Sequence, residues 1–218
     1  MNTRPGPADD PYATLSGVKF LDEKLGQLRQ SIARVSCAHG ANSNLNDVQL
    51  ASVQLIPAAS SIAQSVRHLI KSGHLLSAAV LLRPLLERVA TLAYLDQHPD
   101  AVALWNAGWA HGERPSLRTR LACIIPGAPD TLLSGFMQDV ATHNSLIHGD
   151  PTAANVSLMQ IGERLAYAPD RDYATPRRAH DIAFGAALDV VFLVLIIDRI
   201  FPPDDGDSGE HVAGQVSR

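Results

Sequence analysis

The chain has 218 residues, of which 46% are hydrophobic and 18% are charged. This balance is typical of a soluble globular domain and excludes an intrinsically disordered chain. The formal net charge of −4 and the lack of a dense lysine and arginine run exclude a broadly basic surface, so any contact with nucleic acid would have to be local.

Hydrophobic residues recur at helical spacing from the start of the chain. The first predicted buried stripe consists of Val18, Leu21, Leu25, Leu28, Ile32 and Val35. Asn46 or Asp47 is expected to cap a second helix, which Pro57 is predicted to kink. The buried side of that helix is predicted to contain Val53, Ile56, Ile62, Val66 and Ile70. Gly73 separates it from the apolar stretch that follows.

The middle of the chain predicts two further helices and a hairpin. Pro99 suits the first turn of a short helix that carries Trp105 and Trp109, four residues apart on one face. This pair is interpreted as core, with base stacking as the alternative. Pro129 is expected to open the helix that runs to residue 148, and two short runs around residues 162–163 predict a small β-hairpin.

A long apolar helix is predicted from about Pro176, and its segment from Ile182 to Ile200 approaches the length of a membrane span. Asp189 lies at the middle of that segment, where an unpaired carboxylate in a bilayer would cost about 2.5–3.5 kcal/mol. We therefore interpret the segment as a central buried helix and expect no membrane association. The first residues contain no apolar signal segment, so a cytoplasmic location is expected.

These elements predict an all-α helical bundle of about five to seven helices with a small β-hairpin. The predicted boundaries are a disordered tail at 1–13, one helical-bundle domain at 14–202 and a second disordered tail at 203–218. The sequence contains no phosphate-loop, dinucleotide-binding or G-x-S-x-G motif, and its two cysteines are far apart. No cofactor and no metal are predicted.

Residues 143–150, HNSLIHGD, gather polar side chains at a predicted helix end. Asn144 and His148 would lie about 40° apart on the helix, whereas His143 would lie about 140° from His148, which disfavours a shared metal. Gly149 is expected to stop the helix. His148 could act as a general acid or base, with Asp150 orienting it, or could simply cap carbonyl groups.

This stretch resembles the R-N-x-x-x-H-G signature of the HEPN superfamily (higher eukaryotes and prokaryotes nucleotide-binding), whose members are small helical bundles. Asn144, His148 and Gly149 match the signature, and His143 stands where the family has arginine. The resemblance implies metal-independent endonuclease activity on RNA. The histidine would handle the proton of the ribose 2′-hydroxyl, the arginine would stabilise phosphate charge, and the polar residue between them would orient the pair. It also implies a homodimer with both motifs in one cleft.

The replacement of that arginine by His143 matters, because a histidine offers at most one charge-assisted contact and only when protonated. The stretch around residues 73–95 resembles a bacterial helical family of unknown function with an L-x-R-x-x-x-E helix and a later histidine-glycine pair. Arg83 and Glu87 match that helix. Arg83 and Glu87 lie one turn apart and could form an i,i+4 ion pair on an ordinary solvated edge. Our hypothesis is that both face His148, with Glu87 or Asp150 as the partner of Arg83. The missing cation would then come from Arg83, Arg88 or another subunit.

Three functions follow as alternatives. The first is a HEPN-like ribonuclease of a toxin–antitoxin or phage-defence system, with an antitoxin or defence partner. The second is a catalytically inactive HEPN-like bundle that dimerises or holds a partner, in which the motif is a structural hydrogen-bond cluster. The third is a protein that binds a small ligand or a nucleotide in the cleft between the Arg83 and His148 helices. Arg177 and Arg178, which open the last helix, are expected to contact solvent or a phosphate group.

Overall fold

Seven helices and two strands lie in the residues that the computed structural model describes, which are 9–38, 44–110, 112–148, 158–161, 164–167, 171–173 and 175–203. The elements are α1 (Ser16–Ala38), α2 (Asp47–Lys71), α3 (Leu75–Gln97), α4 (Ala101–Asn106), α5 (Leu117–Ala122), α6 (Asp130–His148), β1 (Leu158–Ile161), β2 (Arg164–Tyr167) and α8 (Pro176–Ile200). The prediction of an all-α helical bundle is confirmed.

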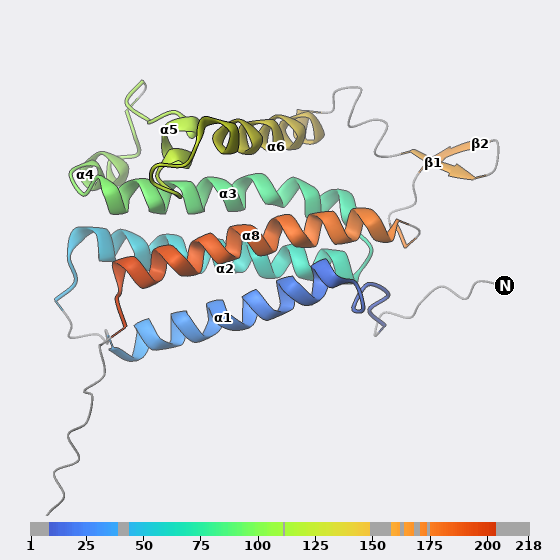
Figure 1. The fold of residues 1–218 in the computed structure, drawn as a ribbon, viewed down its shortest axis with the longest axis horizontal. Helices are drawn as coiled ribbons and strands as arrows, with labels where there is room; N and C mark the ends of the chain where they lie inside the picture. Colours follow the sequence, from blue (N-terminus) through green and yellow to red (C-terminus); the bar gives the residue numbers. More distant parts are fainter. Residues whose placement is uncertain are drawn as a thin grey trace, which may run out of the picture.

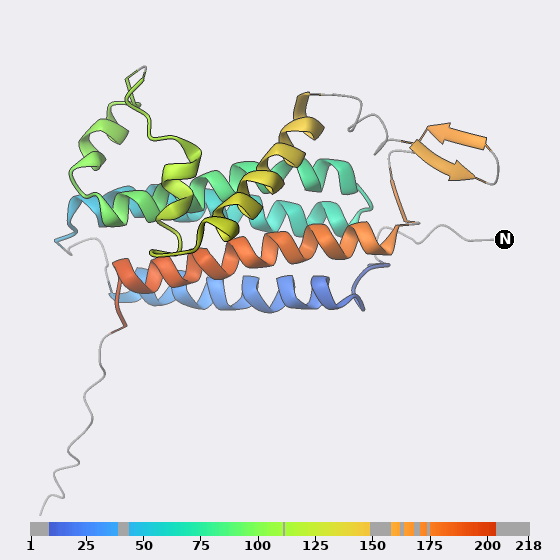
Figure 2. The same cartoon turned by 45° about the horizontal axis from the view of Figure 1, so that its top comes forward.

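The body of the bundle consists of the four long helices α1, α2, α3 and α8 (Figure 1). Helix α8 packs against α1, α2 and α3, and α5 and α6 pack on α3. Figure 2 shows that α6 crosses α3 obliquely and that its C-terminal end rises away from the four long helices. Strands β1 and β2 pair antiparallel outside the bundle, with Leu158 opposite Tyr167.

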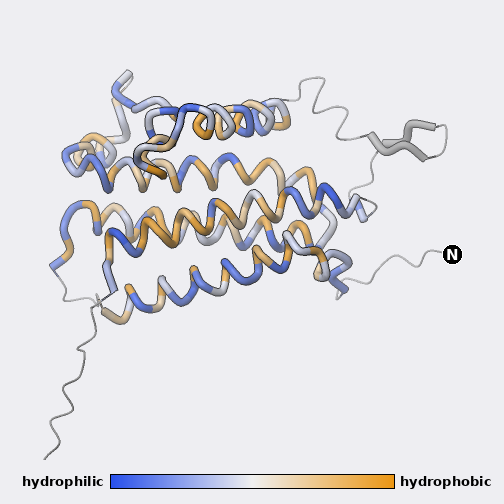
Figure 3. The backbone as a smooth tube through the Cα atoms, viewed as in Figure 1, coloured by the Kyte–Doolittle hydropathy of each residue, from blue (hydrophilic) through white to orange (hydrophobic). Residues whose placement is uncertain are grey.

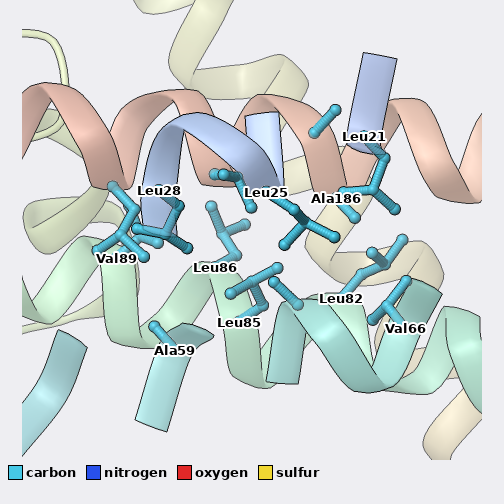
Figure 4. Close-up of a cluster of buried hydrophobic side chains, with 14 of the residues drawn as sticks. Leu21, Leu25, Leu28, Ala59, Val66, Leu82, Leu85, Leu86, Val89 and Ala186 are labelled. Atoms are coloured by element: carbon cyan, nitrogen blue, oxygen red, sulfur yellow. The ribbon is translucent and has the colours of Figure 1, made fainter. Parts of the chain in front are cut away.

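Apolar side chains from all four long helices meet in one core. Figure 4 shows leucines of α1 and α3 facing one another, with residues of α2 and α8 closing the cluster. The stripe predicted on α1 is confirmed at Val18, Leu21, Leu25, Leu28 and Val35, while Ile32 is partly buried. Because burial of apolar surface is the main favourable contribution to folding, this stripe is what attaches α1 to the bundle.

Helix α2 begins as predicted, because the Asn46 side chain accepts a hydrogen bond from the Gln49 backbone N–H and the Gln49 side chain accepts one from the Asn46 backbone N–H. Pro57 lies inside the helix. The prediction that Val53 is buried is wrong, since 44% of it is exposed. Neighbouring helices cover the stripe that contains Ile56, and Val53 lies at the edge of that stripe.

The tryptophan pair does not share one helix face. Trp105 lies in α4, but the helix ends before Gly108, whose φ of 86° reverses the chain, and Trp109 follows with φ 52°. Both rings pack against a small second cluster that contains Leu95 and Val102. The two tryptophans are four residues apart, but the left-handed Gly108 ends the helix before Trp109, so the predicted shared face does not form.

Part of the predicted N-terminal tail belongs to the packed domain. Tyr12 is only 2% exposed, and its hydroxyl donates to the backbone carbonyl of Asp172 at 2.6 Å. Asp10 forms an ion pair with Arg67 at 2.5 Å. The packed chain therefore starts before residue 14, and the remainder of the two predicted tails, at 1–8 and 204–218, lies outside the described residues.

Among the described helices, α8 is long and apolar enough to span a membrane. Half of its most apolar stretch is buried inside the bundle. The hydrophobic colour dominates this helix in Figure 3. Its packing against three other helices agrees with its interpretation as a central helix.

The turn between α2 and α3 requires a glycine. Gly73 has φ 77°, and a Cβ added there would lie 2.8 Å from Cε1 of Tyr173. We expect Gly73→Ala to lower the free energy of unfolding by about 1–3 kcal/mol, because strain and a steric clash act together. Urea unfolding measures the change. The matched control is Gly135→Ala in α6, where nothing lies within 4 Å, and an equal loss in both variants would contradict this account.

Candidate functional site

The HNSLIHGD motif lies at the end of α6. Pro129 precedes this helix, as predicted, and Asp130 in the first turn favours it through the helix dipole. The helix ends at His148, whose side chain is exposed. Gly149 and Asp150 lie outside the described residues. The predicted helix stop at Gly149 and the predicted contact of Asp150 with His148 or Arg83 therefore also fall outside them.

Two side chains of the motif each contain a buried polar atom that forms no hydrogen bond with a described residue. His143 Nδ1 and Asn144 Oδ1 are buried, and neither atom has a partner among the described residues. Val140, one turn before Asn144, is 3% exposed and marks the side of α6 that packs on the bundle. Most buried polar atoms in proteins form a hydrogen bond, so these two atoms are exceptions within the described bundle.

His143 differs electrostatically from the arginine that it replaces. Burial lowers the pKa of His143 below its ordinary value, and the carboxylate of Asp139 opposes that shift. The imidazole is therefore neutral at pH 7. It can donate or accept a hydrogen bond there, but it supplies no positive charge at that position.

A groove of about 490 Å³ lies beside His143, between α3, α6 and α8. We call it the His143 groove. Its lining residues are Ala79, Leu82, Asp139, Thr142, His143, Leu146, Arg178, Asp181, Ile182, Phe184, Gly185 and Leu188. The groove therefore combines an apolar floor with two carboxylates, one imidazole and one guanidinium.

Arg178 is the groove cation, and it interacts with Asp172 at 3.4 Å. Arg177 beside it is 96% exposed and lies 4.0 Å from Asp181. Both arginines were predicted at the start of this helix, but the sequence could not indicate which of them faces solvent. Only the packing of α8 against α6 shows that Arg178 lines the groove and that Arg177 faces solvent.

Arg83 and Glu87 form the predicted i,i+4 ion pair, with 3.2 Å between Nε and Oε1. Both side chains are 27% exposed, and Arg114 approaches the same carboxylate at 3.8 Å. Helix α3 contributes Ala79 and Leu82 to the His143 groove, and Arg83 is absent from its lining. That Arg83 and Glu87 face His148 remains a prediction.

The predicted substitute Arg88 donates from Nη1 to the Pro84 carbonyl at 3.0 Å. No sequence pattern pointed to Arg120, a buried cation on α5 that is 3% exposed. Its Nη1 donates to Thr91 Oγ1 at 2.7 Å. Spacing could not reveal this contact, because it depends on how α5 docks against α3.

Within the described ranges, no group of three or more histidine, cysteine, aspartate or glutamate side chains is arranged to hold a metal ion. Of the two cysteines, Cys37 is exposed and Cys123 is buried.

A family model described as a family of unknown function (DUF5677) matches residues 49–120. The matched stretch begins in the first turn of α2, contains α3 and α4 and ends within α5, so it includes Arg83 and Glu87 but not the α6 motif. No curated protein and no solved structure matches the chain.

Proposed function

We propose that this chain is a metal-independent endoribonuclease of the HEPN-like type, with its reaction centre at the end of α6. The proposal rests on the exposure and hydrogen bonding of the motif side chains. His148 is exposed at the helix end, and the buried Nδ1 of His143 and Oδ1 of Asn144 have no partner among the described residues. A motif kept only as a structural hydrogen-bond cluster would have used these atoms.

In this proposal each residue has a defined task. His148 accepts the proton of a ribose 2′-hydroxyl as that oxygen attacks the adjacent phosphorus. The bond from phosphorus to the 5′-oxygen then breaks, which leaves a 2′,3′-cyclic phosphate, and the departing 5′-oxygen takes a proton. Asn144, one turn before His148, orients the imidazole or the substrate. The neutral His143 donates one hydrogen bond to a phosphate oxygen.

The cation that stabilises the phosphate comes from another residue. Arg178 in the His143 groove supplies a guanidinium on the neighbouring helix. Arg83 remains the alternative that the sequence suggested, with Glu87 holding it and Arg88 next on the same helix. The proposal places the protein in the cytoplasm, where its RNA substrate lies, in a toxin–antitoxin or phage-defence system with an antitoxin or defence partner.

The proposal includes a homodimer. Three large apolar side chains on α8 are solvent-exposed: Phe184 at 44%, Leu188 at 36% and Leu195 at 55%. Their spacing places them on one side of the helix, and Phe184 and Leu188 also line the His143 groove. A second copy covering this stripe would bring a second motif close to the first. Light scattering of the purified chain measures the oligomeric state.

The test is cleavage of single-stranded RNA and tRNA in the presence of EDTA. We expect cleavage by the wild type and a loss of about 10²–10⁴-fold in rate for His148→Ala, as for removal of a general base. His180→Ala is the control, because this half-exposed histidine lies on α8 beside Asp181. Equal cleavage by wild type and His148→Ala would show that His148 does not carry the reaction.

A second variant tests the missing arginine. Asp139 lies close enough to His143 to affect its pKa and would also favour a guanidinium, so His143→Arg is expected to raise the cleavage rate roughly tenfold. Single-turnover kinetics measure this change. An unchanged rate would mean that position 143 does not contact the reacting phosphate.

The alternative function is a catalytically inactive bundle that dimerises or holds a partner. The specific observation in its favour is that the neutral imidazole of His143 replaces a permanent cation. Dimerisation without RNA cleavage by either the wild type or His143→Arg would favour this alternative over the ribonuclease.

A further inference from the structure

Arg120 is a buried cation that forms no ion pair with a described residue. It is 3% exposed, and its Nη1 donates to Thr91 Oγ1 at 2.7 Å and to the Glu87 backbone carbonyl at 3.4 Å. Its Nε is buried and has no hydrogen-bond partner among the described residues. No described carboxylate lies within 4.0 Å of it. A guanidinium removed from water is costly unless negative charge compensates it, so this arrangement is incomplete by itself.

Glu87 is the carboxylate that this region shares. Arg83 lies 3.2 Å from Glu87 and Arg114 lies 3.8 Å from it, so two guanidinium groups already use its two oxygens. Arg120 donates a hydrogen bond to the Glu87 backbone carbonyl. Burial, followed by the like charge of Arg114, lowers the pKa of Arg120, and the carboxylate of Glu87 opposes that shift. Three positive charges therefore gather around a single negative charge.

The neighbouring arginines do not belong to this group. Arg118 on α5 has its own partner, Asp130, at 2.9 Å. Arg88 on α3 donates to the Pro84 carbonyl. Arg83, Arg114 and Arg120 are therefore the three guanidinium groups that gather around Glu87, and we call them the arginine cluster.

From this geometry we infer that the arginine cluster, with Glu87 positioning two of its members, is a binding site for a phosphate group. A guanidinium presents a planar fork of donors that matches a phosphate oxygen pair. Arg114 is 53% exposed and Arg83 is 27% exposed, so a ligand can reach both from solvent, with the buried Arg120 adding its charge from beneath.

Apart from Arg83, which is also the alternative cation of the proposed reaction centre, the arginine cluster is separate from that centre. It lies on α3, on α5 and in the segment before α5, whereas the motif lies on α6. The whole cluster falls within residues 49–120, the stretch that the family model matches. A phosphate group could come from a free nucleotide or from an RNA backbone, and the chemistry that recognises it is the same in both cases.

Isothermal titration calorimetry on the full chain tests the inference with three probes: inorganic phosphate, ADP and a short single-stranded RNA, each at matched ionic strength with chloride as the reference anion. We expect saturable binding of at least one phosphate-bearing probe with one site per chain. Arg114→Gln and Arg83→Gln are each expected to weaken that binding about tenfold, which corresponds to about 1.4 kcal/mol.

Arg118→Gln is the matched control, because it removes a nearby half-exposed arginine that already has a carboxylate partner. Arg120→Met removes the buried charge. If that variant fails to fold, the two glutamine variants at the solvent-accessible positions 83 and 114 keep the test valid. Tight binding of ADP or phosphate identifies a free phosphate ligand, and binding of RNA alone identifies a nucleic-acid backbone. No saturable binding of any probe, or equal weakening by Arg118→Gln, would overturn the inference.

Discussion

The stability of this protein is expected to fall as the pH rises from 5 to 8, and Asp189 is expected to cause much of that fall. Asp189 lies in the middle of α8, is 7% exposed and lies close enough to the like charge of Asp139 to be repelled by it. Burial, followed by the repulsion from Asp139, raises the pKa of Asp189 well above its ordinary value of 3.8. The folded protein therefore keeps a proton that the unfolded chain loses.

The sign of the effect follows from that proton. Below pH 3.8 both states are protonated, and this contribution to stability is fully present. Above that value the unfolded chain releases its proton first, so the free energy of unfolding falls by up to about 1.4 kcal/mol per pH unit until the folded pKa is reached. Urea unfolding at pH 5, 6, 7 and 8 measures the slope.

Asp189→Asn is expected to flatten this slope, since an amide of similar shape cannot ionise. The control is Asp181→Asn on the same helix, because the Asp181 side chain is 64% exposed. The other titrating groups are present in every variant, so their contributions to the pH slope cancel when the variants are compared. The explanation fails if wild type and Asp189→Asn lose stability equally between pH 5 and pH 8.

Leu85→Ala is expected to lower the free energy of unfolding by about 2–5 kcal/mol. Leu85 has no exposed surface, and Figure 4 shows it among core residues contributed by the four long helices. Truncation removes apolar contacts and leaves a cavity that the surrounding helices can only partly fill. Chemical denaturation of wild type and variant under the same conditions measures the difference.

The matched control for this substitution is Leu104→Ala on α4, where 44% of the leucine is exposed. Its expected effect is about 0.5 kcal/mol or less, because little apolar surface returns to water. Equal losses at the two positions would show that burial at Leu85 is not what stabilises the bundle.

Local patterns were enough to predict most of the helices. The spacing of Val18, Leu21 and Leu25 predicted the buried side of α1, and Asn46, one of the two predicted capping residues, caps the start of α2. These features depend only on residues within one or two turns. Trp109 shows where such reasoning ends, because the left-handed Gly108 stops the helix and removes the predicted face.

The candidate sites depend more on tertiary packing. Residues 143–148 were recognised from their order along the chain, but the burial that makes His143 neutral arises from neighbouring helices. Arg114 and Arg120 lie far from Glu87 in sequence, and only the docking of α5 on α3 brings them together. Tyr12 likewise joins the core through a contact with Asp172, which a local pattern cannot reveal.

The position of α8 in the fold has a consequence for biosynthesis. This helix is the last of the described elements, yet it packs against α1, α2 and α3. As the chain leaves the ribosome, the first three helices emerge with the apolar faces that α8 will cover still open to solvent. Such nascent surfaces are typical binding sites for chaperones, so we expect this chain to depend on them until its last helix emerges.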